Sequence, residues 1–122
     1  MMKVLNLLAS GNPGGIESLC NNIDKYSKYE NYWVFLFDGG KIANEMKKRN
    51  PDNVCVLKYK KYQYIKYIKT INDMCKNYKI DIVNIHHGGT YCNIIYTRLQ
   101  KMNPNIKFVR SLHSCYEDKY NL

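Results

Sequence analysis

Short apolar runs alternate with amphipathic segments along the whole chain, and this alternation limits the fold more than any other feature. The run "KVLNLLA" at 3–9 and the run "IDIVNIHH" at 80–87 have the length and apolar content of buried strands. Between such runs, apolar residues recur every three or four positions, as they do on one face of a helix. Strands separated by helical segments indicate βαβ units, and hence a parallel sheet with helices on both faces.

The pattern predicts five strands and four helices in a chain of 122 residues, which is one domain in length. The strands are expected at 3–9, 31–40, 53–59, 81–86 and 106–112, and the helices at 15–26, 41–49, 62–78 and 90–102. We therefore expect an α/β, doubly wound, mostly parallel sheet of Rossmann-like type. Its commonest strand order, 3-2-1-4-5, places the first and fourth strands side by side where the chain reverses direction.

The unusual residues gather at the carboxyl ends of three strands that this order makes neighbours. After the first strand come Gly11, Gly14 and Gly15; after the fourth, His86, His87, Gly88 and Gly89; after the fifth, Arg110, Ser111, His113 and Ser114. Ligands of doubly wound sheets bind outside the carboxyl ends of the strands, at the switch point. The sequence therefore predicts one crevice that contains all three histidines of the chain.

The glycines at the end of the first strand allow two interpretations. Gly14 and Gly15 precede a predicted helix, whose free N–H groups and dipole suit an anion such as a phosphate. The spacing Gly11-x-x-Gly14-Gly15 is neither a Walker loop nor the dinucleotide fingerprint. A purely structural tight turn is the alternative, and the sequence leaves both open.

The polar residues near this crevice also have structural alternatives. His86 and His87 are adjacent, so in a strand they point to opposite faces and cannot readily share one metal ion. His86 could equally be a hydrogen-bonded core histidine, whereas His113 lies among polar residues, which favours a site. Glu17 is in the first turn of the first predicted helix, where the helix dipole alone would explain it, although it also faces the crevice mouth. We expect no metal site.

The five cysteines are Cys20, Cys55, Cys75, Cys92 and Cys115. Their number is odd, their spacing matches no zinc site, and no secretion signal precedes them, so we expect reduced, mostly buried thiols in a cytoplasmic protein. A thiol nucleophile at Cys115 beside His113 would need a third, orienting group, and none is evident.

The net charge of +9 comes from 19 basic and 10 acidic residues. The basic residues are 16 Lys and 3 Arg, a bias that A/T-rich codons explain, and phosphate and base recognition favours arginine, so we consider nucleic acid unlikely. The run "KYKKYQYIKYIK" from Lys58 to Lys69 could contact single-stranded nucleic acid or a lipid headgroup layer. The alternative is a solvated lysine face behind an apolar stripe.

Three segments resemble the glycosyltransferase family 4 (group 1) enzymes. The opening "MKVLNLLASGNPGGIESLCNNI" resembles the family's first strand, Gly-Gly turn and helix; "KIDIVNIHH" resembles its D-[IV]-[IV]-x-x-H strand; and "KFVRSLHS" resembles its later strand ending in [TS]-x-H. The matches occur in the family's order over nearly the whole chain. The resemblance implies a GT-B architecture of two Rossmann-like domains, of which residues 1–122 would be most of the amino-terminal, acceptor-side domain.

The resemblance also implies a reaction and roles for residues. A sugar would pass from a nucleotide-sugar donor to a glycan or lipid-linked acceptor, with retention at the anomeric carbon and with no required metal or cofactor. His113 would contact the donor sugar near the reacting centre, and Gly14 and Gly15 would approach the donor through backbone N–H groups. Glu17 and the loop His86, His87 and Gly88 would shape the acceptor side. We expect a cytoplasmic setting, and the basic run Lys58–Lys69, rather than the resemblance, suggests peripheral contact with the inner membrane face.

The chain also departs from the family. Many members have His or Arg shortly after the Gly-Gly turn, where this chain has Leu19 and Cys20. The second domain, which would hold most of the nucleotide sugar with two glutamates eight residues apart, is absent, and no two glutamates here have that spacing. We therefore expect a truncated chain that is inactive alone. A small basic module that binds nucleic acid or another anion is the alternative function.

Overall fold

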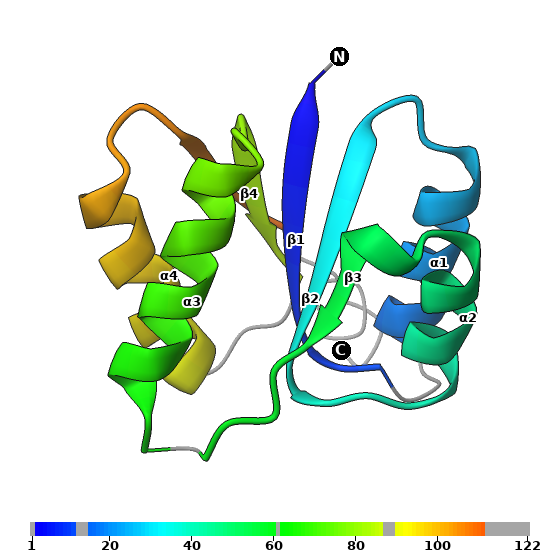
Figure 1. Cartoon of the computed structure of the whole chain (residues 1–122), viewed down its shortest axis with the longest axis horizontal. Coiled ribbons are helices and arrows are strands. Elements are labelled where there is room, and N and C mark those ends of the chain that lie inside the picture. The colour runs from blue at the N-terminus through cyan, green and yellow to red at the C-terminus, as the bar shows by residue number, and fades with distance from the viewer. Residues whose placement is uncertain (1, 12–14, 61, 87–89, 112–122) are drawn as a thin grey trace, which may run out of the picture.

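The computed structural model of the chain describes residues 2–11, 15–60, 62–86 and 90–111. Its five strands form one parallel sheet in the order β3-β2-β1-β4-β5, which confirms the predicted fold class and strand order (Figure 1). The elements are β1 (Lys3–Ser10), α1 (Gly15–Tyr26), β2 (Glu30–Asp38), α2 (Lys41–Arg49), β3 (Val54–Val56), α3 (Tyr64–Asn77), β4 (Ile82–Ile85), α4 (Thr90–Met102) and β5 (Lys107–Arg110), with a 3-10 turn at Pro51–Asn53.

The central strand β1 is buried along most of its length, and Asn6 is the one polar residue among its buried residues 4–8. Residues 4–8 of β1 are all buried, and so are residues 31–36 of the adjacent β2. Continuous apolar runs of this kind are typical of strands in parallel sheets that have helices on both sides.

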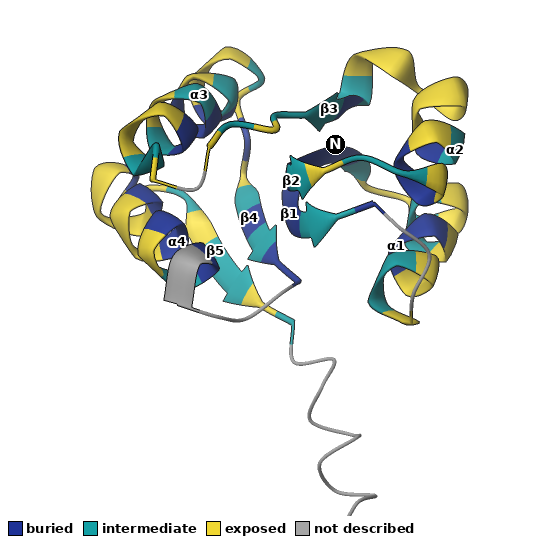
Figure 2. Ribbon diagram, turned by 90° about the horizontal axis from the view of Figure 1, so that it is seen from below, coloured by how far each residue is buried: buried dark blue, intermediate teal, exposed yellow. Residues whose placement is uncertain are grey.

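Helices α3 and α4 cover one face of the sheet, and α1 and α2 stand on the other, as the view in Figure 2 shows. Leu5 and Leu7 of β1 point into the α3–α4 core, which is closed by the buried Tyr67, Ile71 and Leu99. Because successive side chains of a strand point to opposite faces of the sheet, Leu8 points to the other face and belongs to a second core. That second core is formed by Cys20, Trp33, Phe35, Ile42, Ala43, Met46 and Val54.

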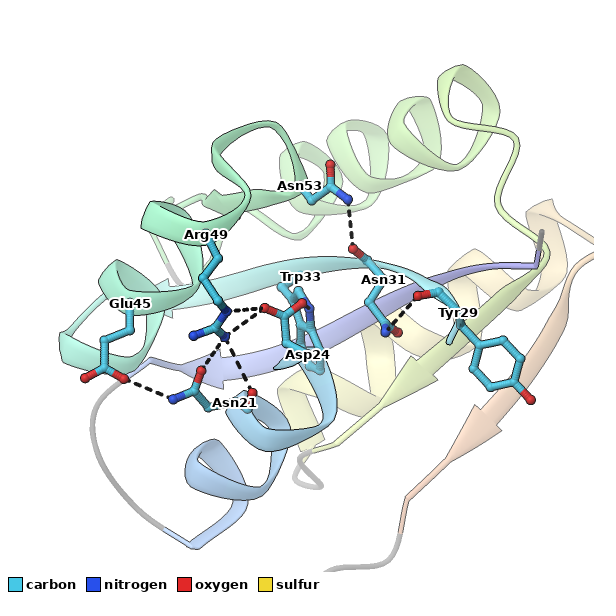
Figure 3. A network of polar contacts seen from close by, with 8 residues as sticks. All are labelled: Asn21, Asp24, Tyr29, Asn31, Trp33, Glu45, Arg49 and Asn53. Atoms are coloured by element: carbon cyan, nitrogen blue, oxygen red, sulfur yellow. Dashed lines mark hydrogen bonds and ion pairs between the residues drawn. The ribbon is translucent and has the colours of Figure 1, made fainter. Parts of the chain in front are cut away.

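A polar network ties α1 and α2 to β2 (Figure 3). The Asp24 carboxylate of α1 accepts a 2.8 Å hydrogen bond from Trp33 Nε1 and forms a 2.8 Å ion pair with Arg49 Nη2 of α2. Asn21 accepts from Arg49 and donates to Glu45 at 3.0 Å. Because Asp24 is nearly buried, these partners are what allow its charge to remain there.

The apolar residues Ile94, Ile95, Leu99 and Met102 have the spacing of one face of α4 and would be expected to lie inside, but only two of them do. Ile94 and Met102 are exposed, whereas Cys92, Ile95, Tyr96 and Leu99 are buried. The buried Asn103 explains the rotation. Its side chain donates to Asn72 Oδ1 of α3 at 2.8 Å and to the Leu99 carbonyl at 2.9 Å, and these bonds turn the stripe that ends at residue 103 toward α3.

Candidate functional site

The carboxyl ends of β1, β4 and β5 lie in one row at the lower edge of the sheet in Figure 1. The pairing continues past the strands, because His86 N–H donates to the Leu7 carbonyl and Ser111 N–H to the Ile85 carbonyl, both at 3.0 Å. His86 and Ser111 therefore occupy neighbouring strand ends, as the sequence predicts. Four predicted site residues, Gly14, His87, Gly88 and His113, lie outside the described residues.

Gly11 has a structural role at this edge. Its N–H lies 3.1 Å from the Asp38 carbonyl and 3.0 Å from that of Gly39, and its own carbonyl accepts from Ile42 N–H at 2.9 Å. A Cβ built on Gly11 would lie 2.6 Å from the Ala43 Cβ, closer than atoms can pack. The structural interpretation of the glycines therefore accounts for Gly11, and no ligand is needed to explain it.

Gly15 is different, because it is the exposed first residue of α1. Beyond its chain neighbours and the backbone of α1, a Cβ there would meet no described atom within 4 Å. The first N–H groups of a helix have no partner within the helix, and they carry the positive end of its dipole. An anion could therefore approach this backbone closely. Glu17, in the same turn, is half-buried.

His86 is buried, with 3% of its surface exposed, and its Nε2 atom faces the side-chain amide of Asn6. Asn6 Nδ2 lies 3.3 Å from the Tyr32 carbonyl and 3.2 Å from Asn31 Oδ1; because a carbonyl only accepts, this orients the Asn6 amide. Asn6 Oδ1 then faces His86 Nε2 at 2.9 Å, so Nε2 carries a proton and donates. This geometry agrees with the interpretation of His86 as a hydrogen-bonded core histidine.

A groove of about 280 Å³ runs along the α1 side of β1 and β4. Its lining residues are Val4, Asn6, Ile23, Ser27, Tyr29, Asn31, Ile82, Asn84, His86 and Val109. Within it, Asn84 Oδ1 accepts from Ser111 Oγ at 3.0 Å, which links β4 to the residue that follows β5. The groove thus continues from His86, at the carboxyl edge, toward the start of β2.

The sequence interpretation missed Asn6, Asn31 and Asn84 as members of this polar row. The available signal is the two-residue period of a strand. Asn84 and His86 are two apart and therefore share a face, and Asn6 interrupts the apolar residues Val4 and Leu8 on the same face of β1. A polar residue at such a position indicates a partner on the neighbouring strand.

The described cysteines are poor nucleophiles. Burial, with a smaller contribution from the charge of Glu17, raises the pKa of Cys20 to about 12, and burial raises the pKa of Cys75 to about 11. Burial also raises the pKa values of Cys55 and Cys92, so all four thiols stay protonated at neutral pH. Three of the four are buried and Cys55 is half-buried, as expected for reduced structural thiols.

Neither a metal cluster nor a membrane span is found where the structure describes the chain. No group of three or more His, Cys, Asp or Glu side chains there could hold a metal ion. Within the same residues, every helix falls short of the length and hydrophobicity that a bilayer crossing requires.

Comparison with known proteins supports the fold alone. No protein-family model matches the chain, and no curated protein sequence matches it. Among solved structures, it resembles a UDP-N-acetylglucosamine 2-epimerase with a TM-score of 0.57 and 16% identity, over 89% of this chain and 32% of that one. It also resembles a glycosyltransferase from Rickettsia africae ESF-5 with a TM-score of 0.60 and 16% identity, over 98% of this chain and 33% of that one.

The chain therefore has a Rossmann-like, GT-B-like fold, and it spans about a third of the length of the structures it matches.

Proposed function

We propose that this chain is the amino-terminal, acceptor-side portion of a retaining glycosyltransferase of the family 4 type. The parent enzyme would transfer a sugar from a nucleotide-sugar donor to a glycan or lipid-linked acceptor. The observation that carries the proposal is the row formed by the ends of β1, β4 and β5, beside the open backbone at Gly15. The GT-B-like fold agrees with this proposal.

The first turn of α1 would act on the donor. We assign Gly14 and Gly15 to the donor's phosphates, which their backbone N–H groups would approach. Because the charge on the leaving phosphate grows as the glycosidic bond breaks, fixed N–H dipoles aimed at it stabilise the transition state more than the ground state. A side chain at position 15 would project into the space that now surrounds Gly15.

The ends of β4 and β5 would shape the rest of the cleft. We assign His113 to the donor sugar near the reacting centre, and Glu17, His86, His87 and Gly88 to the acceptor side. His86 is buried against Asn6, so its contribution would be to hold the end of β4 in place for the residues that follow. The proposed reaction retains the configuration at the anomeric carbon without a protein nucleophile. This is compatible with the four described thiols, which stay protonated and are therefore poor nucleophiles.

A second domain would supply most of the donor contacts, so the chain of 122 residues is expected to be inactive alone, and we propose a cytoplasmic setting for the complete enzyme. A measured release of nucleotide from a nucleotide sugar by this chain alone would contradict that expectation.

The donor assignment is tested by substituting Gly15. In calorimetric titrations with uridine diphosphate glucose and guanosine diphosphate mannose, Gly15→Val should weaken binding of the preferred probe about tenfold or more, the effect of ~1.4 kcal/mol lost from charged hydrogen bonds. The matched control is Gly39→Ala, whose new Cβ would meet Val56 at an ordinary 3.6 Å. Binding that Gly15→Val leaves unchanged would refute the assignment.

A further inference from the structure

The lysine–tyrosine run divides into side chains that hold the fold together and side chains that do not. Tyr67 of α3 is fully buried, and its hydroxyl donates to the Tyr59 carbonyl. The two rings lie 5.0 Å apart between centroids, and the Tyr59 hydroxyl is 3.2 Å from Thr70 Oγ1. Tyr59 and Tyr67 thus fasten the loop after β3 to α3, which accounts for two aromatic residues of the run.

Tyr62 and Ile65 are left pointing outward. Tyr62 is 74% exposed and Ile65 is 82% exposed. Ile65 lies in the first turn of α3, with Lys69 four residues further along the helix, and Tyr62 lies in the turn that precedes α3. Together with Gln63 and Tyr64, these residues line a shallow hollow of about 540 Å³. A large aliphatic side chain this exposed lacks a folding role in the part of the chain that the structure describes.

The charge around these two residues has one sign. Between Asp52 and Asp73 the sequence contains five lysines and no acidic residue. Of these lysines, Lys58, Lys60, Lys66 and Lys69 are described, and all four are exposed. Lys66 Nζ lies 4.4 Å from the centroid of the Tyr59 ring, which holds that charge beside the hollow.

The position of this surface in the fold is also informative. β3 runs toward the lower edge of the sheet in Figure 1, and α3 begins at that edge. The ends of β1, β4 and β5 lie along the same edge, because every strand is parallel. A flat partner that met the start of α3 would therefore lie beside the candidate site.

We propose that Lys58, Lys60, Tyr62, Ile65, Lys66 and Lys69, the α3 amino-terminal surface, dock on an anionic lipid bilayer. Tyr62 and Ile65 enter the boundary between headgroups and acyl chains, where an amphipathic ring and an aliphatic side chain are both favourable. The lysines remain at the level of the lipid phosphates, which their long stems can reach. An aliphatic residue offers no stacking face to a base, so Ile65 favours a bilayer over nucleic acid.

The test is co-sedimentation of the chain with two kinds of vesicle, one of phosphatidylcholine alone and one of equal parts phosphatidylglycerol and phosphatidylcholine. We expect binding to the anionic vesicles that weakens with added salt. Lys66→Gln with Lys69→Gln should weaken it ~25-fold, from about fivefold for each lysine. Tyr62→Ser with Ile65→Ser should weaken it ~10-fold or more, because the buried apolar area is lost.

Matched controls lie on the other side of the molecule. Tyr26 of α1 is 81% exposed, and Lys47 and Lys48 of α2 are exposed, so Tyr26→Ser and Lys47→Gln with Lys48→Gln should leave vesicle binding unchanged. All substituted side chains are exposed, so the circular dichroism melting curves should coincide. Equal loss in the controls, equal binding to both vesicle types or no vesicle binding would overturn the proposal.

Two further measurements accompany the vesicle experiment: binding of the chain to nucleic acid and self-association of the chain. Binding to a single-stranded oligonucleotide that Ile65→Ser does not weaken, in the absence of vesicle binding, would overturn the proposal in favour of nucleic acid. A dimer in sedimentation velocity that Ile65→Ser dissociates would overturn it in favour of a second copy of the chain. None of these measurements uses a sugar donor, so this inference and the proposed transferase function can fail separately.

Discussion

The face of the sheet on the α1 and α2 side has two halves of opposite character. Over β2 and β3, which we call the covered half, Trp33 and Phe35 are fully buried beneath α1 and α2. Over β4 and β5, which we call the open half, the sheet borders the groove, which Asn84 and Val109 line together with Ile23 of α1. One sheet therefore presents a sealed apolar core and a polar groove on the same face.

The difference between the halves shows how the chain keeps polar groups near its core. In the open half, polar side chains bond to one another across strands: His86 to Asn6, and Ser111 to Asn84. A buried polar group without a partner is costly, so the buried His86 and Asn6 require each other as hydrogen-bond partners. The open half thus combines a rigid sheet with an accessible polar lining, and the covered half supplies stability.

The largest expected effect is in the covered half. Trp33→Ala should lower the free energy of unfolding by ~3–5 kcal/mol, because it removes a fully buried ring and leaves a cavity. Urea unfolding followed by circular dichroism measures the loss. The exposed Tyr26→Ala is the matched control and should change stability by less than ~0.5 kcal/mol. Similar losses in both variants would mean that Trp33 is not the centre of this core.

At the boundary between the halves, Asn6→Ala should cost ~1–3 kcal/mol, because His86 loses its acceptor and Asn31 and Tyr32 lose a donor. The same urea titration measures it, with the exposed Asn22→Ala as control. Proton NMR should also show the His86 Nε2 proton exchanging faster with water. A loss no larger than that of Asn22→Ala would show that the network is already open to solvent.

Alkaline pH should weaken the covered half through Cys20. Burial raises the pKa of Cys20 from 9.0 to about 12, so above pH 9 the unfolded chain releases the thiol proton while the folded chain keeps it. This contribution is complete below pH 9 and is lost as pH rises toward 12; at pH 10 the loss is ~1.4 kcal/mol relative to neutral pH. Between pH 8 and pH 10, wild type should lose that much more stability than Cys20→Ala. Equal losses would contradict a buried, protonated thiol.

The smallest effect is expected in the open half. Asn84→Ala removes one hydrogen bond, from Ser111, in a half-buried position that water can reach, so it should cost less than ~1 kcal/mol. Thermal unfolding is sufficient to measure it. A cost as large as that of Trp33→Ala would mean that the groove is part of the core and would erase the distinction between the halves.

The sequence predicted the elements and their order because both depend on local patterns. The continuous apolar run of β1 and the period near 3.6 in α3 are visible in single segments, and the handedness of crossovers limits the topology. The orientation of α4 was not predictable in this way, because the bond from Asn103 to Asn72 joins two helices 31 residues apart. The hydrogen bond between His86 and Asn6 of β1 is equally non-local, because the two residues are 80 positions apart in the sequence.

The candidate site was predicted in outline. The sequence placed His86 and the glycines at neighbouring strand ends, but it could not distinguish Gly11, which the Ala43 side chain requires, from Gly15, whose Cβ position no described side chain approaches. Only the distances between non-adjacent segments separate a structural glycine from one that leaves room for a ligand.

The central claim is that a ligand approaches the ends of β1, β4 and β5 from outside the sheet. Amide chemical shifts of the ¹⁵N-labelled chain, recorded during titration with uridine diphosphate glucose and guanosine diphosphate mannose, test it most directly. We expect the shifts that change with one of them to cluster on Gly15, Glu17, His86 and Ser111. Changes confined to the outer surfaces of α3 and α4, or none at saturating ligand, would contradict the claim.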